Sequence, residues 1–225
     1  MKTVDFWYYT ADGQLVKYNS FEHLDLVLSA KSIGAPAPKL LSVDVPCGDG
    51  ELDYTEFNGA VNYANRALSF DFTMIGAANE YLNKYSRLQN LLNGRKMFVT
   101  LSEDADFYYI GRVIVNEWRS EKAIGKVTID VNAEPYKMRK ATTVILYTLS
   151  SEMVINCKNL KKPVMPKITA TLGTAYIKFG EEKIEFAGEY SHKPAVILEE
   201  GDNLLTIGAE SGTATVMIEY QEGSL

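Results

Sequence analysis

The chain has 225 residues and a formal net charge of −6, with 46% hydrophobic and 23% charged residues. This composition is typical of a globular protein that buries a core, in one large domain or two ordinary ones. The dispersed lysines and arginines argue against binding to nucleic acid. No apolar run is long enough to span a bilayer, and Asp5 interrupts the stretch that an export signal would need. Cys47 and Cys157 stand far apart, which predicts unpaired thiols in a reducing cytoplasm.

The first part of the chain predicts a hairpin, an ambiguous segment and a long loop. Residues 4–18 form two alternating segments separated by Asp-Gly, a dipeptide typical of tight hairpin turns. Residues 24–30 fit a strand and a helix equally well. Two prolines within residues 33–39 force an extended connection. Residues 42–65 begin with a short apolar alternation, Val43 and Val45, and continue after Pro46 as a long loop crowded with glycine and carboxylates between two strands.

A strand, a helix and three more strands are predicted next. Residues 66–75 alternate apolar and polar side chains, as a strand does. Residues 79–93 predict a helix, because their apolar side chains recur at spacings of four, three and four and Gly94 stands at a suitable C-terminal stop. We expect this apolar stripe to pack on a sheet. The following strands are predicted at residues 96–101, 107–118 and 122–131.

Beyond about residue 140 the pattern changes to many short strands without a helix. Alternating runs separated by glycine-containing turns lie at residues 142–149, 153–157, 167–172, 175–179, 183–186, 195–198, 204–207 and 213–220. This spacing predicts an antiparallel β-sandwich. We therefore predict a mainly β (β-rich α+β) fold, with a barrel-like domain and one helix at residues 1–138 and a sandwich domain at residues 139–225.

The loop at residues 42–65 resembles a calcium-binding loop at first sight, but its residues do not fit one. With Glu56 as the last ligand, the first and third ligand positions are Val45 and Cys47, which offer no carboxylate to a hard cation. Pro46 between them disfavours the flanking helix. We predict no metal site and no cofactor.

The sequence shows no recognisable catalytic arrangement. His23 and His192 are its two histidines, and neither has a nucleophile motif or a second histidine at ligand spacing. Adjacent glutamates at 181–182 and 199–200 stand in predicted hairpin turns, where carboxylates usually face water. We therefore predict that the protein is not an enzyme.

Aromatic residues leave a carbohydrate-binding module as the alternative function. The clusters at residues 6–9 and 108–109 alternate along predicted strands, so half of their side chains should face a core. Glycan binding by the C-terminal domain would need aromatic side chains exposed along a groove. The candidates there, most of which we expect in the core, are Tyr176, Phe179, Phe186 and Tyr190.

A series of short motifs, in order along nearly the whole chain, resembles the distal tail (Dit) proteins of long-tailed phages, the siphophages. The motifs are SIGAPAPK (32–39), VDVP (43–46), DGELD (49–53), TE (55–56), NRALSF (65–70), LLNG (91–94), YYIGR (108–112), AEPY (133–136), GDN (201–203) and IEYQEG (218–223). One departure is Cys47, where relatives more often carry glycine after the proline. A side chain at that position is strained if the backbone has φ > 0.

The resemblance implies a structural virion component, made in the bacterial host cytoplasm, that forms a ring, commonly a hexamer, where the tail tube meets the baseplate. The implied partners are further copies of the chain, the tail tube protein and tail-associated baseplate proteins, with no specific nucleic acid and no membrane. The N-terminal domain would build the ring. The C-terminal domain, similar to a galectin-like sandwich, would project outward and hold host-recognition components.

Within this family, the loop at residues 42–65 is interpreted as an assembly loop. Its acids find no cation site and no catalytic partner, so we expect them to contact a neighbouring subunit. The candidate interface residues are Asp49, Glu51, Asp53 and Glu56.

Overall fold

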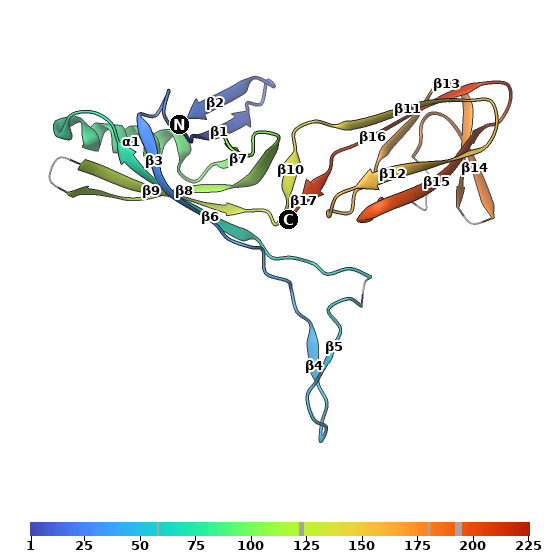
Figure 1. Ribbon diagram of the computed structural model, residues 1–225, viewed down its shortest axis with the longest axis horizontal. Coiled ribbons are helices and arrows are strands. Elements are labelled where there is room, and N and C mark those ends of the chain that lie inside the picture. Colours follow the sequence, from blue (N-terminus) through green and yellow to red (C-terminus); the bar gives the residue numbers. More distant parts are fainter. Residues whose placement is uncertain (58, 122–123, 180, 192–194) are drawn as a thin grey trace. The chain divides into compact units, whose positions relative to one another are not determined.

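The computed structural model describes residues 1–225 except 58, 122–123, 180 and 192–194 (Figure 1). The chain divides into two compact units, Met1–Lys137 and Met138–Leu225. Both are built from antiparallel strands, and the α-helix lies in the first, so the predicted mainly β fold class is confirmed. Among the described residues, no helix has the length and apolar character needed to cross a membrane.

The N-terminal unit is built around an antiparallel sheet in the order β2-β1-β7-β8-β9-β6-β3. Its strands are β1 (Val4–Tyr9), β2 (Leu15–Asn19), β3 (Leu26–Ile33), β6 (Arg66–Met74), β7 (Lys96–Leu101), β8 (Phe107–Glu121) and β9 (Ile124–Ala133). Strict alternation in β6 buries Leu68, Phe70 and Phe72 on one face. The ambiguous segment 24–30 falls largely in strand β3, where Leu26 is buried and pairs with β6.

The helical stripe packs on this sheet, as predicted. A short 3-10 turn, η1 (Ala78–Glu80), leads into α1 (Tyr81–Leu92), which buries Tyr81, Leu88 and Leu92 in the core of the unit. The helix stops before Gly94, which has φ +77° and adopts the left-handed conformation that glycine tolerates.

The predicted loop at residues 42–65 is partly a hairpin. Strands β4 (Ser42–Asp44) and β5 (Glu51–Asp53) pair antiparallel in a sheet of their own. The alternation of Val43 and Val45 indicates an extended segment at β4. The sequence pattern does not reveal β5, because this strand is only three residues long and wholly exposed, so it has no buried face to create a two-residue hydrophobic period.

The C-terminal unit is a second antiparallel sheet, in the order β11-β16-β13-β15-β12, with β14 also paired to β13. Two short strands pair with each other: β10, which precedes the strands of this sheet in the chain, and β17, which follows them. The strands are β10 (Lys137–Arg139), β11 (Thr143–Leu149), β12 (Met153–Asn159), β13 (Lys167–Phe179), β14 (Glu182–Glu189), β15 (Gly201–Ala209), β16 (Ala214–Tyr220) and β17 (Gly223–Ser224).

Strand β13 joins the two halves of this sheet. Its first half pairs with β16 and its second half with β15, with a break in register between Ala170 and Leu172. Gly173 follows the break at φ +70°, and a Cβ atom there would lie 2.5 Å from the carbonyl oxygen of Thr213. Side chains of both halves, such as Ile168 and Ile177, belong to one core. The two runs predicted at 167–172 and 175–179 are therefore one strand.

The strand predicted at residues 195–198 is wrong. Val196 and Leu198 are buried, which creates the alternation, but only Leu198 forms a bridge, an isolated one with Val164. The side chains thus alternate between core and solvent on an extended segment that is not part of a sheet ladder.

Candidate assembly surface

The segment between β3 and β6, residues 34–65, leaves the sheet as a long arm with the β4–β5 hairpin toward its end (Figure 1). Its two legs are held together by backbone hydrogen bonds. The amide of Lys39 donates to the carbonyl of Asn62 (2.7 Å), and the amide of Ala64 donates to the carbonyl of Ala37 (2.8 Å). Prolines in the outgoing leg keep it extended. The arm is therefore an ordered ribbon.

A single arginine anchors the base of the arm. The Arg66 side chain is 7% exposed, and its Nε donates to the carbonyl of Gly34 at 2.7 Å. Its Nη1 donates to the carbonyl of Pro135 at 3.3 Å, and its guanidinium lies 5.3 Å from the centre of the Tyr109 ring. This residue lies in the NRALSF motif, and no local sequence pattern indicates its anchoring role.

The tip of the arm is a tight turn. Cys47 has φ +62° and Gly50 has φ +78°, and the amide of Gly48 donates to the carbonyl of Val45 at 3.0 Å. The departure from glycine at Cys47 therefore falls at a left-handed position, which costs a side chain about 1 kcal/mol or more. Strands flank the turn, whereas a calcium-binding EF-hand needs two helices.

The four predicted acids all lie on this arm and all are exposed. Asp49 is in the turn, Glu51 and Asp53 are on β5, and Glu56 is in the turn after it. Glu51 accepts a hydrogen bond from the hydroxyl of Ser42 on the opposite strand. Asp53 accepts one from the amide of Thr55 at 2.8 Å, and the side-chain and backbone hydrogen bonds of Thr55 lower the pKa of Asp53.

Asp49 and Glu56 differ from this pair. Within the described part of the chain, their side chains make no hydrogen bond or ion pair. Residues 34–65 carry five carboxylates and a single basic residue, Lys39, which gives a net charge of −4. The arm therefore presents unpaired negative charge to its surroundings.

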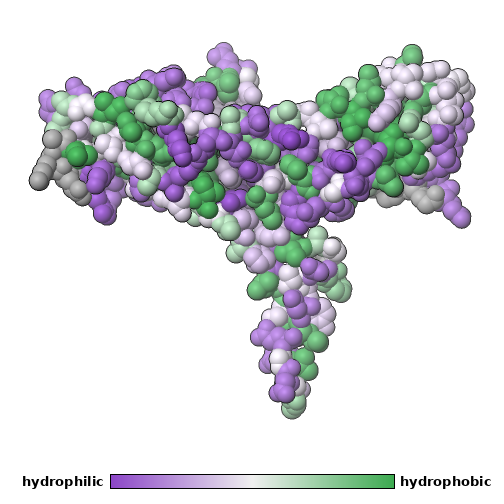
Figure 2. Space-filling view, in the orientation of Figure 1, coloured by the Kyte–Doolittle hydropathy of each residue, from purple (hydrophilic) through white to green (hydrophobic). Residues whose placement is uncertain are grey.

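The arm also exposes apolar side chains, which the sequence-based prediction did not include. Leu40 is 74% and Phe57 is 78% exposed. Further exposed apolar residues on the arm are Leu41, Val43, Leu52 and Tyr54. Figure 2 shows hydrophobic and hydrophilic residues side by side along it. A two-stranded ribbon has no core in which to bury such side chains. The available signal was the apolar pair Leu40-Leu41 just after the proline-containing segment at residues 34–39.

A group of aromatic side chains lies on the outer face of β1 and β7. Phe6 faces the core, whereas Trp7 points away from it and stacks on Phe98 with ring centres 4.3 Å apart. Tyr9, 58% exposed, and Tyr108 contact both rings edge-on. The expectation that half of the cluster at residues 6–9 faces the core is confirmed.

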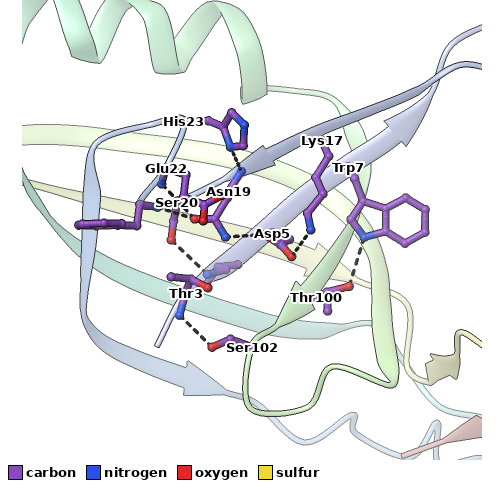
Figure 3. Close-up of polar contacts among 12 residues, drawn as sticks. Thr3, Asp5, Trp7, Lys17, Asn19, Ser20, Glu22, His23, Thr100 and Ser102 are labelled. Carbon is purple, nitrogen blue, oxygen red and sulfur yellow. Dashed lines mark hydrogen bonds and ion pairs between the residues drawn. The ribbon is translucent and has the colours of Figure 1, made fainter. Parts of the chain in front are cut away.

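Polar contacts hold this β1–β2 hairpin in place (Figure 3). The indole of Trp7 donates to the hydroxyl of Thr100 at 3.2 Å, and Lys17 forms a 2.8 Å ion pair with Asp5. His23 accepts a hydrogen bond at Nδ1 from the amide of Asn19 at 3.1 Å, which fixes the turn after β2. The His23 ring is therefore engaged in a hydrogen bond that stabilises this turn.

The remaining candidate catalytic and metal-binding residues in the described part of the chain are not gathered into one site. His192 lies outside the described residues, and the glutamates at 181–182 and 199–200 are exposed. Among the residues that the structure describes, no cluster of three or more His, Cys, Asp or Glu side chains could hold a metal ion. Cys47 and Cys157 are unpaired, as predicted.

A cleft of about 710 Å³, lined by both polar and apolar residues, lies against the outer face of the N-terminal sheet. Its wall includes Asp71, which accepts a 2.6 Å hydrogen bond from the hydroxyl of Thr128, and Asn116, which donates to Asp130 at 2.5 Å. Hydroxyl and amide groups thus engage these carboxylates, and the arrangement resembles ordinary cross-strand pairing.

The aromatic candidates for glycan binding in the C-terminal unit are not arranged as a platform. Phe186 is buried and packs edge-on against the half-buried Tyr190, with ring centres 5.3 Å apart. Tyr176 is buried against Gly208, where a Cβ atom would lie 2.4 Å from the ring, and Lys183 covers it. The side chain of Phe179 lies outside the described residues.

No family model matches the sequence, and no curated protein matches it. Among solved structures, the chain is similar to the crystal structure of SPP1 Dit (gp 19.1), described as a paradigm of the hub adsorption apparatus in phages that infect Gram-positive bacteria. The TM-score is 0.63 at 13% identity, over 98% of this chain and 99% of that chain. The similarity shows that the two chains share a fold over nearly their whole length.

Proposed function

We propose that this chain is a structural component of the tail of a long-tailed phage or prophage, where it forms a ring that joins the tail tube to the baseplate or host-adhesion device. The shared fold with SPP1 Dit, a hub protein of an adsorption apparatus, supports this role. The order of the Dit-like motifs in the sequence supports it independently. The chain acts in the virion without catalysis.

The main structural support for a ring is the arm, residues 34–65, because it offers a surface for contact between subunits. A ring of identical copies needs a heterologous contact, in which one patch of a subunit meets a different patch of the next. The arm supplies one such patch, because it extends beyond the core of its unit and exposes leucine side chains such as Leu41 and Leu52. Burying them against a neighbour removes apolar surface from water, which drives association.

In this proposal, acidic side chains on the arm contact the neighbouring subunit. Asp49 and Glu56 are the stronger contact candidates, because their side chains make no hydrogen bond or ion pair within the described chain, whereas those of Glu51 and Asp53 are engaged within the arm. Carboxylates at such a boundary contribute more to register and orientation than to affinity. The partners are neighbouring copies, the tube protein and baseplate proteins.

The ring is tested by placing charge on the exposed apolar face of the arm. The double variant Leu41→Asp, Leu52→Asp changes side chains that are exposed in the single chain, so its fold should be unchanged. We expect wild-type protein to form a six-fold ring by light scattering and negative-stain microscopy and the variant to lose it. Leu204→Asp, at a 70% exposed site in the other unit, is the matched control. A ring that survives the double variant contradicts the proposed role of the arm.

The acids are tested separately with neutral isosteres. Asp49→Asn with Glu56→Gln should weaken the ring and reduce its sensitivity to salt, since screening acts on charges that cross the boundary. Glu22→Gln, at an exposed site away from the arm, is the control. An unchanged salt dependence in the double variant would remove these acids from the interface.

A further inference from the structure

Strand β11 ends the C-terminal sheet, and its outer edge pairs with none of the described strands. Its sequence, TVILYTL, contains no charged residue and no proline. On one face Val144 is 54% and Leu146 is 60% exposed, while Ile145 and Tyr147 on the other face are half-buried against the core. Backbone donors and acceptors along such an edge are a template for another strand.

The other long edge strands of the described chain are protected against such pairing. Strands β2, β3 and β12 each carry a lysine, at Lys17, Lys31 and Lys158, and β14 carries four charged residues. Charged side chains on an edge are a common device that prevents sheets from joining. Among these described edge strands, β11 alone carries no charged residue, so its edge is suited to association.

We propose that β11 pairs antiparallel with β11 of a second copy of this chain, about a two-fold axis through Leu146. In this register Ile145 lies opposite Tyr147, Val144 opposite Thr148, and Leu146 opposite its own symmetry mate. Pairs of aromatic and β-branched side chains are favourable across antiparallel strands. Because the strand is uncharged, the two-fold axis brings no like charges together.

A second copy of this chain can supply the strand that pairs with the free edge of β11. The edge requires an extended, uncharged strand with apolar side chains on both faces, and β11 is such a strand. The arm is another exposed ribbon of the described chain, but residues 34–65 carry a net charge of −4. Figure 2 shows hydrophobic surface over the part of the C-terminal unit where β11 lies in Figure 1. The contact would continue the sheet across two molecules.

This contact does not depend on the proposed ring. It is isologous, with the same strand on both sides, whereas the ring uses a heterologous contact. The arm variant Leu41→Asp, Leu52→Asp therefore provides a background in which ring formation and edge pairing are separated. In that background we expect light scattering to give twice the chain mass, and a mass of one chain at all concentrations would overturn the proposal.

The edge is tested in the full-length chain, in that background, with three substitutions. Leu146→Lys places like charges opposite each other, so the measured mass should fall by half, and Leu146→Glu should do the same. Leu204→Lys, at an exposed site on β15 inside the sheet, should leave the mass unchanged. Circular dichroism verifies that each variant is folded.

Mixing the two charged variants gives the sharpest result. Lysine in one copy then lies opposite glutamate in the other, so a one-to-one mixture should recover the doubled mass that each variant alone has lost. A mass that Leu146→Lys leaves unchanged, or a mixture that stays at one chain, would overturn the pairing about Leu146.

Discussion

The Nε atom of Arg66 lies 2.7 Å from the carbonyl oxygen of Gly34, and this hydrogen bond closes the base of the arm. Residue 34 begins the arm and Arg66 follows its last residue, so one buried side chain joins both ends. The amide of Gly34 also donates to the carbonyl of Ala67 at 2.8 Å, which completes a small clasp. The direction of the arm therefore depends on this clasp.

Substituting Arg66 by alanine should loosen that clasp. Hydrogen bonds from a charged group contribute about 1.5–3 kcal/mol each, so we expect the free energy of unfolding to fall by roughly 2–3 kcal/mol. Amide exchange of Gly34 should become faster as its neighbour frays. Arg66→Lys keeps the charge without the planar fork and should lie between the two. Unchanged protection of Gly34 in Arg66→Ala would show that the clasp does not depend on this arginine.

Gly173 in the bend of β13 should not tolerate a side chain. Its φ of +70° costs alanine about 1–2 kcal/mol, and the clash with the Thr213 carbonyl should add a further 1–3 kcal/mol. Gly212→Ala separates the two effects, because Gly212 has φ +63° and open space around it. Urea denaturation should therefore rank Gly173→Ala well below Gly212→Ala, and equal losses would mean that the bend relaxes freely.

Much of the fold follows from periodicity where one face of a strand is buried. Strand β6 buries Leu68, Phe70 and Phe72 on one side, and the same alternation is visible in the sequence. The rule fails in two opposite ways. Val196 and Leu198 alternate without joining a ladder, and β5 joins a ladder without burying either face. Alternation therefore reports burial, and only indirectly reports strand pairing.

The candidate assembly surface likewise contains residues that the sequence predicted and residues that it did not. The sequence identified Asp49 and Glu56 on the arm, because acids in a glycine-rich loop stand out from a strand pattern. It missed Leu52 and Phe57, whose exposure depends on the arm leaving its own unit, a tertiary feature that no local pattern records. Arg66 was missed for a related reason, since its carbonyl partners, Gly34 and Pro135, are distant in sequence.

Replacing Cys47 by glycine should stabilise the tip of the arm. Cys47 adopts φ +62°, and removing its side chain relieves about 1 kcal/mol of strain. We expect amide exchange within β4 and β5 to slow by about five-fold, since 1 kcal/mol corresponds to that factor in local opening. Gly50→Ala, at φ +78°, should act in the opposite direction. Faster exchange in Cys47→Gly would show that added chain entropy outweighs the relieved strain.

The buried thiol of Cys157 should make the protein sensitive to alkaline pH. Burial raises the pKa of Cys157 to about 11 from an ordinary value of 9.0. Below pH 9 the thiol is neutral in both states and its contribution is fully present. Between pH 9 and 11 the unfolded chain loses this proton while the folded chain keeps it. The free energy of unfolding should then fall as pH rises, by at most about 1.4 kcal/mol per pH unit.

The effect of Cys157 is best isolated between pH 8 and 10. Burial also raises the pKa of Tyr220, to about 12 from an ordinary value of 10.0, so the tyrosine adds a loss of the same sign only above pH 10. Cys157→Ala leaves a cavity and lowers stability at every pH, but its urea midpoint should change less from pH 8 to 10 than that of wild type. Cys47→Ala, which removes the exposed thiol, should retain the wild-type pH dependence. Parallel curves for wild type and Cys157→Ala would mean that the buried thiol is not the group that titrates on unfolding.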